Sequence, residues 1–259
     1  CLWNHQQENY YMEKMKIKEI FGKWDETIIW SCLQEIMGEI YTNPPENDAA
    51  LAILGDFAFY AGKPDEKLLR LKPKNCNQDF IIMVPQNEKW AELIEKCYGK
   101  NARKVTRYAI KKEKDIFDKS KLEQAILQLP EEYELKLLEQ EEYELCRKNK
   151  WANDLVSQFQ DYPAYKELGL GVVALKDGEL VAGASSYSRY KDGIEIEIDT
   201  REDHRKKGLA YACGAKLILE CLKRGLYPSW DAQNKWSVGL AEKLGYHFSH
   251  EYTAYEVKW

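Results

Sequence analysis

Residues 194–200 alternate isoleucine with acidic residues, and this stretch constrains the fold more than any other part of the chain. The run Ile-Glu-Ile-Glu-Ile-Asp-Thr has a period of two, which predicts a strand with one apolar face and one carboxylate face. Beyond Gly208 the apolar residues recur at helical intervals as far as Arg224-Gly225, a basic turn closed by glycine. The pattern therefore predicts a strand that leads through a short polar turn into a helix.

The polar turn concentrates positive charge. Its cations are Arg201, Arg205, Lys206 and Lys207. A helix start offers unpaired N–H groups and a partial positive charge, and a glycine lets backbone approach a ligand closely. The turn therefore favours a phosphate-bearing ligand, and the plainer alternative is a solvated helix cap.

Two motifs resemble those of a known superfamily. Arg205-x-x-Gly208-x-Ala210 resembles the R/Q-x-x-G-x-G/A signature of the GNAT superfamily of N-acetyltransferases, which bind acyl-coenzyme A. The segment 234–246, Asn-x-x-Ser-x-x-Leu-Ala-x-Lys-Leu-Gly-Tyr, resembles the second GNAT motif. The resemblance covers most of the chain. The segments 184–187, 193–200 and 228–232 are similar to the branch that includes zwittermicin A resistance proteins, and the resemblance extends to 55–62 and 106–113.

The resemblance implies both a fold and a cofactor. The implied fold is α/β (α+β), a GNAT-type mixed, mostly antiparallel sheet flanked by helices. The implied reaction is direct transfer of an acetyl group from acetyl-CoA (coenzyme A) to a primary amine of a small molecule in a ternary complex. The expected cofactor-binding residues are Ile198, Thr200, Arg205, Lys206, Lys207, Gly208, Leu209, Ala210, Asn234 and Ser237. For Asn234 a simple helix cap is the alternative, and Ser237 has the alternative of a surface serine.

Glu195, Glu197 and Asp199 project from one face of the predicted strand. Carboxylates suit binding a cationic amine and removing its proton, and family members often carry a glutamate base on this strand. Glu197 and Glu195 are the predicted catalytic residues. A bulge that changes the facing of the strand, or a merely solvated acidic edge, is the alternative.

The chain departs from the family at the position of the general acid. Ala241 stands where many GNAT members carry a tyrosine, so Tyr246, Tyr211 or water would have to protonate the thiolate. This departure keeps open a second reading, a catalytically inactive acyl-CoA-binding sensor or interaction module. A protein-directed acetyltransferase is a third. His204 and His247 are expected to be structural, and Trp230, Trp236 and Tyr246 are expected in the core.

The chain divides by composition near Pro130. Residues 1–130 are expected to form a smaller α/β auxiliary domain, which resembles a degenerate GNAT-like half, and residues 131–259 to form the acetyltransferase domain. The first part is expected to hold helices over 26–41 and 88–98, strands over 50–60, 80–85 and 105–111, and a helix capped by Ser120. Residues 1–11 show no helical stripe. The second part is expected to hold strands over 133–138, 171–184 and 251–257, helical segments near 140–148 and 151–159, a short strand at 228–231 and a helix from Asn234 to Leu244.

Composition bears on the class of ligand, on metal binding and on the expected location of the protein. A net charge of −5 gives no support for nucleic-acid or membrane-surface binding. The seven cysteines have neither zinc-ligand spacing nor an even count, so reduced core thiols and no metal site are expected. No apolar run is long enough to span a membrane and no signal-peptide pattern is present, so the expected location is cytoplasmic. The identity of the acceptor amine and the oligomeric state are not readable from the sequence.

Overall fold

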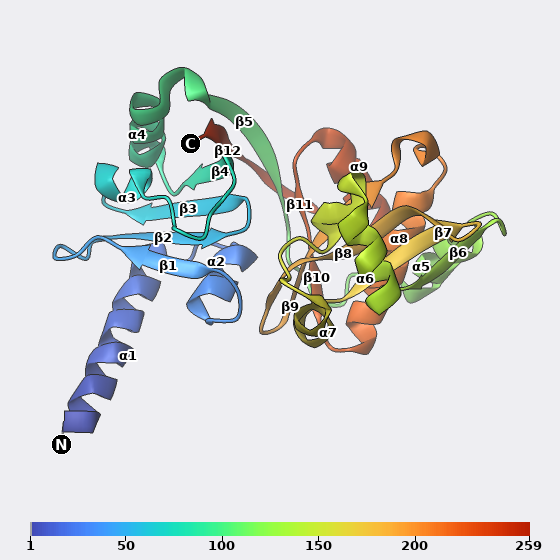
Figure 1. Ribbon diagram of the computed structural model, residues 1–259, viewed down its shortest axis with the longest axis horizontal. Helices are drawn as coiled ribbons and strands as arrows, with labels where there is room; N and C mark the ends of the chain where they lie inside the picture. Colours follow the sequence, from blue (N-terminus) through green and yellow to red (C-terminus); the bar gives the residue numbers. More distant parts are fainter. Residues whose placement is uncertain (1) are drawn as a thin grey trace. The chain divides into compact units, whose positions relative to one another are not determined.

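The computed structural model describes Leu2–Trp259, with side chains from His5 onward. It divides into two compact units: unit 1 is Cys1–Thr106 with Thr253–Trp259, and unit 2 is Arg107–Tyr252 (Figure 1). The chain passes between the units within β5 (Ala102–Ile110) and within β12 (Phe248–Lys258). This division differs from the expected boundary at residue 130. Residues 107–130 belong to unit 2 because α5 (Lys119–Leu127) packs there against α8 (Leu209–Lys223).

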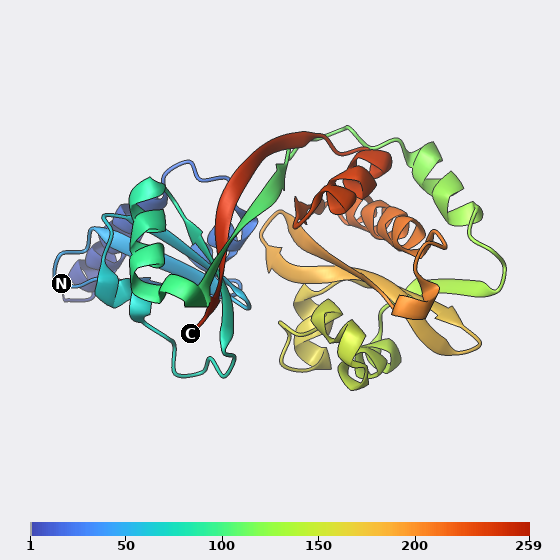
Figure 2. The same ribbon diagram turned by 90° about the horizontal axis from the view of Figure 1, so that it is seen from above.

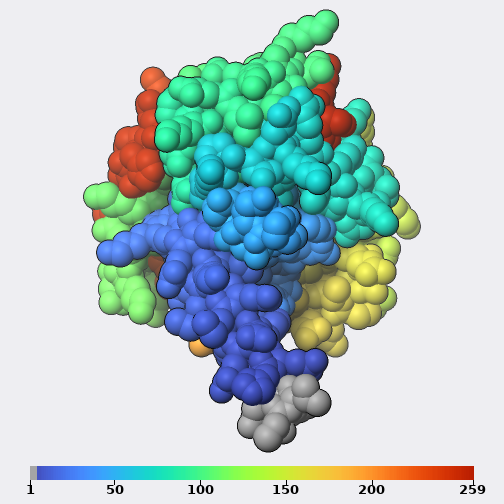
Figure 3. Space-filling model, turned by 90° about the vertical axis from the view of Figure 1, so that its left-hand side faces the viewer, coloured from blue at the N-terminus to red at the C-terminus, as the bar shows by residue number. Residues whose placement is uncertain are grey.

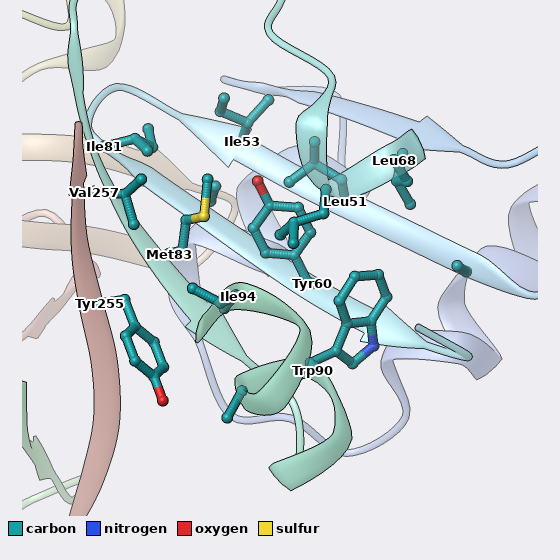
Figure 4. Close-up of a cluster of buried hydrophobic side chains, with 14 residues drawn as sticks. Leu51, Ile53, Tyr60, Leu68, Ile81, Met83, Trp90, Ile94, Tyr255 and Val257 are labelled. Carbon is teal, nitrogen blue, oxygen red and sulfur yellow. The ribbon is translucent and has the colours of Figure 1, made fainter. Parts of the chain in front are cut away.

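Unit 1 is a sheet with helices packed on it. Its strands follow the order β1-β2-β3-β4-β12, where β1 is Glu39–Thr42, β2 Ala49–Leu54, β3 Phe57–Gly62 and β4 Phe80–Pro85. Its helices are α1 (Leu2–Phe21), α2 (Thr27–Leu33), α3 (Glu66–Arg70), α4 (Glu88–Tyr98) and the short η1 (Gly99–Asn101). Figure 4 shows its core, in which Tyr60 of β3 lies between Met83 of β4 and Trp90 of α4. The indole N–H of Trp90 donates to the carbonyl of Gly62, which satisfies the polar atom of this buried ring.

Several expectations for unit 1 are confirmed. Residues 50–60 form the hairpin β2–β3 with its turn at Gly55-Asp56, the strand over 80–85 is β4, and the helix over 88–98 is α4. The helix expected over 26–41 is wrong beyond Leu33. Glu35 and Gly38 adopt positive φ angles of 58° and 78°, which end the helix, and β1 follows.

The N-terminal segment also departs from expectation. Residues 2–21 form the helix α1, although residues 1–11 carry no helical stripe. The side chains of residues 5–12 are exposed, so this part of the helix needs no apolar face. In Figure 3 the dark blue atoms of α1 extend below the lighter blue strands of unit 1.

Unit 2 contains a five-stranded sheet in the order β10-β9-β8-β7-β6. Its strands are β6 (Tyr133–Leu137), β7 (Gly171–Lys176), β8 (Glu179–Tyr190), β9 (Gly193–Thr200) and β10 (Tyr227–Ser229). β6 to β9 are antiparallel neighbours, and β10 pairs parallel to β9. Figure 2 shows α5, α8 and α9 (Lys235–Leu244) on one face, with α6 (Gln140–Lys148), η2 (Lys150–Leu155) and α7 (Tyr162–Leu168) on the other. The mixed, mostly antiparallel sheet flanked by helices is confirmed.

Details of unit 2 follow local sequence. The β7–β8 hairpin turns at Asp177-Gly178, whose φ angles of 50° and 80° match the primed turn that Asp-Gly favours. α5 starts after Asp118, whose side chain accepts from the Lys121 N–H, so Ser120 is not its cap. The helical segment expected over 151–159 is the shorter 3₁₀ helix η2.

The ends of unit 2 differ from the expected sheet. β12 is not one of its five strands, because residues 255–258 pair with β4 in unit 1. The short strand expected at 228–231 is two elements, β10 and β11 (Asp231–Ala232), and β11 pairs with the end of β5. Among the described residues, six cysteines are free thiols and no cluster of three or more His, Cys, Asp or Glu could hold a metal. Within residues 2–259 no helix combines the length and the apolar character that crossing a membrane requires.

Candidate active site

The two faces of β9 have opposite chemistry, as the alternation predicts. Ile194 is buried in the core beneath α8, and Ile196 and Ile198 pack partly buried against the same core. Glu195, Glu197 and Asp199 lie on the other face and are half-buried. The irregularity lies in β8 at Tyr187, where the register with β9 shifts between Ser186 and Ser188, so the alternative of a bulge that changes the facing of β9 does not apply. The strand β9 therefore keeps the predicted facing.

One edge of β9 is only partly covered. β8 pairs with β9 over the whole of residues 193–200, whereas β10 pairs only over residues 193–195. In the part of the chain that the structure describes, no strand covers residues 196–200 on the β10 side. Ile198 and Thr200 lie in this stretch. An extended ligand arm can add to such an edge as an extra strand.

The turn between β9 and α8 contains two residues with positive φ angles. Lys206 has φ 63° and Gly208 has φ 79°, and Gly208 is the N-cap residue of α8. Within the part of the chain that the structure describes, no side chain caps this helix, so the N–H groups at its start have no side-chain acceptor there. A Cβ placed on Gly208 would meet no protein atom within 4 Å, so the space beside the helix start is open.

The cations of the turn do not all point to a ligand. Arg201 is held by ion pairs with Asp203 and Glu179. Arg205, Lys206 and Lys207 are exposed. Of the two remaining predicted residues of the turn, Leu209 is buried in the core and can offer a ligand only its backbone, and Ala210 is partly exposed in the first helical turn. The turn thus brings together three exposed cations and an uncapped helix start, which fits an anionic group such as a pyrophosphate.

The start of α9 is built differently. The Asn234 side chain accepts from the Ser237 N–H at 2.9 Å and caps the helix. The Ser237 hydroxyl accepts from the Trp230 indole N–H at 3.1 Å. Both side chains therefore have structural partners, and this geometry alone does not assign them to a ligand.

Burial and mutual repulsion shape the carboxylates of β9. Burial raises the pKa of Asp199 to about 6. Burial and the neighbouring Asp199 raise the pKa of Glu197 well above its ordinary value, while the Arg107 guanidinium acts in the opposite direction. The two carboxyl groups lie on the same face of β9, two residues apart. Both shifts favour the protonated form of the two carboxyl groups.

The predicted base Glu195 has different neighbours. It lies opposite Ser188 of β8 on one side and opposite Ser229 of β10 on the other. Ser229 is buried and exchanges a hydrogen bond with Tyr190. Glu195 therefore lies where β10 still covers the edge, whereas Glu197 lies where that cover has ended.

An acidic residue from another element joins the pair. Asp154 of η2 raises the pKa of both Glu197 and Asp199 by repulsion, and its own side chain is exposed. η2 reaches this face because Gly183, the residue opposite Asp199, has no side chain: a Cβ there would lie 2.7 Å from Leu155 Cδ1. Sequence reasoning missed Asp154, since it lies far from the strand in the chain, and undervalued Asp199.

Comparisons with known proteins identify the family to which this fold belongs. The sequence profile of the family described as GNAT acetyltransferase matches residues 18–255. The chain belongs to this family. A crystal structure titled GCN5-related N-acetyltransferase-like protein, from Streptococcus suis 89/1591, is 47% identical, with a TM-score of 0.90 over 95% of this chain and 99% of that one. A GCN5-related N-acetyltransferase from Kribbella flavida shares the fold at 16% identity, with a TM-score of 0.55 over 95% of each chain.

A curated relative is also similar. The uncharacterized N-acetyltransferase YdfB of Bacillus subtilis (strain 168) is 36% identical over 89 residues, which is 34% of each chain. The match thus spans about a third of the length of this relative. Together, the family, the relative and the solved structures support an acyltransferase.

The structure narrows the choice of general acid in this GNAT protein. Ala241 is fully buried in the core that α8 and α9 share. Tyr246 is buried as well, and its hydroxyl donates to the Pro228 carbonyl at 2.6 Å. Burial raises the pKa of Tyr246 well above its ordinary value, which makes it a poor proton donor. Tyr211 lies in the first turn of α8, with the Lys243 ammonium 4.1 Å from its ring centre.

The histidines and tryptophans have mostly structural surroundings. The His204 ring shares a buried hydrogen bond with the Tyr133 hydroxyl at 3.1 Å, and His247 pairs with Glu113 at 2.8 Å. Trp230 is buried, as expected. The expectation for Trp236 is wrong: it is 70% exposed, because it occupies the second position of α9 on the side away from the core.

Proposed function

We propose that this protein is an acetyl-CoA-dependent N-acetyltransferase that acetylates a primary amine of a small molecule by direct transfer in a ternary complex. One observation carries the proposal. One edge of β9 is only partly paired, and the strand leads into the start of α8, which has no side-chain cap and is flanked by cations. The same strand presents the carboxyl groups of Glu197 and Asp199 on one of its faces. A donor site and a proton acceptor thus share one strand.

The donor site uses backbone more than side chains. The N–H groups at the start of α8, with Arg205, Lys206 and Lys207, would hold the pyrophosphate of acetyl-CoA. The edge of β9 at Ile198 and Thr200 would hold its extended arm. Asn234 and Ser237 would complete the site from α9. The thioester, when bound there, supplies an activated acetyl group.

The carboxylates would handle the amine. The carboxyl groups would attract the ammonium group, and the pair can accept its proton, because burial and charge repulsion raise the pKa of both Glu197 and Asp199. Glu197 and Glu195 keep their proposed catalytic roles, with Asp199 added. With Ala241 buried and Tyr246 committed to a carbonyl, the thiolate would be protonated by water or by Tyr211.

The inactive sensor is the weaker alternative. A sensor needs the donor site but has no use for two half-buried carboxyl groups that repel each other, an arrangement that costs stability. The zwittermicin A resistance branch, the auxiliary role of residues 1–130 with an acetyltransferase domain over 131–259, and the cytoplasmic location stay predictions.

Two measurements test the proposal in sequence. Calorimetry with acetyl-CoA should show binding to the full chain, and thiol release should then accelerate when a small primary amine is added. Binding without thiol release across neutral, cationic and zwitterionic amines would favour the sensor. Absence of binding would contradict both readings.

A further inference from the structure

The carboxylate cluster extends beyond the pair that the proposed reaction needs. Glu197 and Asp199 are half-buried on β9, whereas Asp154 on η2 is exposed. All three interact electrostatically. The cluster therefore has an inner pair and an outer single carboxylate.

Neighbouring cations leave this charge incompletely balanced. Arg107 acts on Glu197, but its guanidinium is bound by the Asp231 carboxylate at 2.8 Å and by the Tyr252 hydroxyl. Arg205 acts on Asp199 from the exposed turn assigned above to the donor. The cluster thus keeps excess negative charge when the donor site is occupied.

A second observation indicates that a ligand belongs on this face. Ser188 is fully buried, and among the described residues its hydroxyl has no hydrogen-bond partner. Ser188 lies opposite Glu195, and opposite residues of an antiparallel pair share a face, so the hydroxyl is on the carboxylate side. The Asp199 Oδ2 atom is likewise buried without a partner. Buried polar atoms are normally satisfied, and an ammonium group supplies three donors.

We propose that the acceptor is a diamine or polyamine, whose reacting amine lies at the Glu197–Asp199 pair and whose second, unreactive ammonium group lies at Asp154. This inference rests on the proposed function. In the reaction the amine nitrogen forms a bond to the acetyl carbon while the carbon–sulfur bond breaks. The ammonium nitrogen loses two protons: one passes through the carboxylate pair to solvent, and the other is balanced by protonation of the thiolate, so that coenzyme A leaves as the thiol.

A matched set of four-carbon amines tests the charge requirement. Thiol release is measured at saturating acetyl-CoA with a diamine, with butylamine and with γ-aminobutyrate. We expect kcat/KM for the diamine to exceed that for butylamine about tenfold, the contribution of one charge-assisted contact, and γ-aminobutyrate to be the poorest substrate. Equal values for the diamine and butylamine, or a preference for γ-aminobutyrate, would overturn the inference.

Variants of the outer carboxylate place the second ammonium group. Asp154→Asn should lower the diamine-to-butylamine ratio of kcat/KM towards one. Asp161→Asn is the control, because Asp161 is an exposed carboxylate of the same unit that caps α7, and asparagine also caps helices. A ratio that Asp154→Asn leaves unchanged, or that Asp161→Asn lowers equally, would overturn the assignment.

A binding measurement separates this inference from the proposed function. If no amine supports thiol release, the proposed function fails. Calorimetry of the diamine on the wild-type protein with coenzyme A bound then decides the inference independently. Binding that Asp154→Asn weakens about tenfold supports the dication site, and no detectable binding overturns it.

Discussion

Two regions of unit 2 differ in whether their polar groups have partners within the protein. In the β11–α9 region, Asp231 is paired with Arg107 and Tyr252, Asn234 caps α9, and Ser237 accepts from Trp230. In the β9–α8 region, the described residues provide no side-chain cap for the helix start, and two half-buried carboxyl groups lie two residues apart on one face of β9. The polar groups of the first region have partners within the protein, and we expect the second region to gain its partners from ligands.

Substitutions in the Glu197–Asp199 pair should give the largest difference in kcat between the two regions. Glu197→Gln and Asp199→Asn should each lower kcat about 10²–10⁴-fold, the usual contribution of a positioned base. Affinity for acetyl-CoA should stay within about twofold, since the donor site lies on the edge of β9 and on α8. Steady-state kinetics with calorimetry checks both values. Asp231→Asn is the control and should leave kcat within about threefold. Full turnover of both β9 variants would remove the pair from the mechanism.

The left-handed glycine gives the next largest effect. Gly208→Val should weaken acetyl-CoA binding by about 10–100-fold, because a β-branched residue is strained at φ 79° and its side chain would fill the open space beside the helix start. Gly208→Asn tolerates this conformation better and should lose less affinity. Calorimetry measures both. Unchanged affinity in a folded Gly208→Val protein would rule out this site.

Stability should change in opposite directions in the two regions. The pKa of Asp199 is raised to about 6, so the folded state binds a proton more tightly and stability falls as pH rises from about 4 to about 6. Asp199→Asn should therefore raise the free energy of unfolding by roughly 1–3 kcal/mol above pH 6, with no gain near pH 4.

The matching substitution in the β11–α9 region is at Asp231, whose carboxylate is paired with Arg107. Asp231→Asn should lower the free energy of unfolding by about 1–3 kcal/mol, because it weakens the pairing of the mostly buried Arg107. Denaturant titrations at pH 4 and pH 7.5 distinguish the two variants. A loss of stability in Asp199→Asn at pH 7.5 would show that the pair stabilises the fold.

The cap of α9 gives the smallest effect. Asn234→Ala should cost about 1 kcal/mol of unfolding free energy, the usual value of a helix cap. If Asn234 only caps the helix, affinity for acetyl-CoA stays within about twofold. A tenfold loss of affinity would instead place Asn234 in the donor site. Thermal unfolding and calorimetry on the same variant separate these results.

Local periodicity predicted the centre of unit 2 well. Alternation identified β9 and its two faces, and Asn234 and Leu244 are the cap and the last residue of α9. The glycine at the start of α8 could also be predicted, because a helix preceded by Gly208 matches a known signature. These features depend on residues close together in the sequence.

Longer-range relations could not be predicted in the same way. Nothing local in residues 251–257 shows that β12 pairs with β4, and Pro130 resembles a boundary although α5 before it packs on α8. Asp154 joins the acidic face only because Gly183 lets η2 approach β8. The absence of a strand beside residues 196–200 likewise follows from where β10 ends in space.

Amide hydrogen exchange with and without acetyl-CoA tests the contrast between the two regions most directly. Peptides that cover residues 196–211 report the edge of β9 and the start of α8, and peptides that cover residues 231–240 report the start of α9. We predict that acetyl-CoA slows exchange markedly in the first set and less in the second. Saturating acetyl-CoA that leaves residues 196–211 unprotected, or that protects residues 231–240 more strongly, would contradict the account.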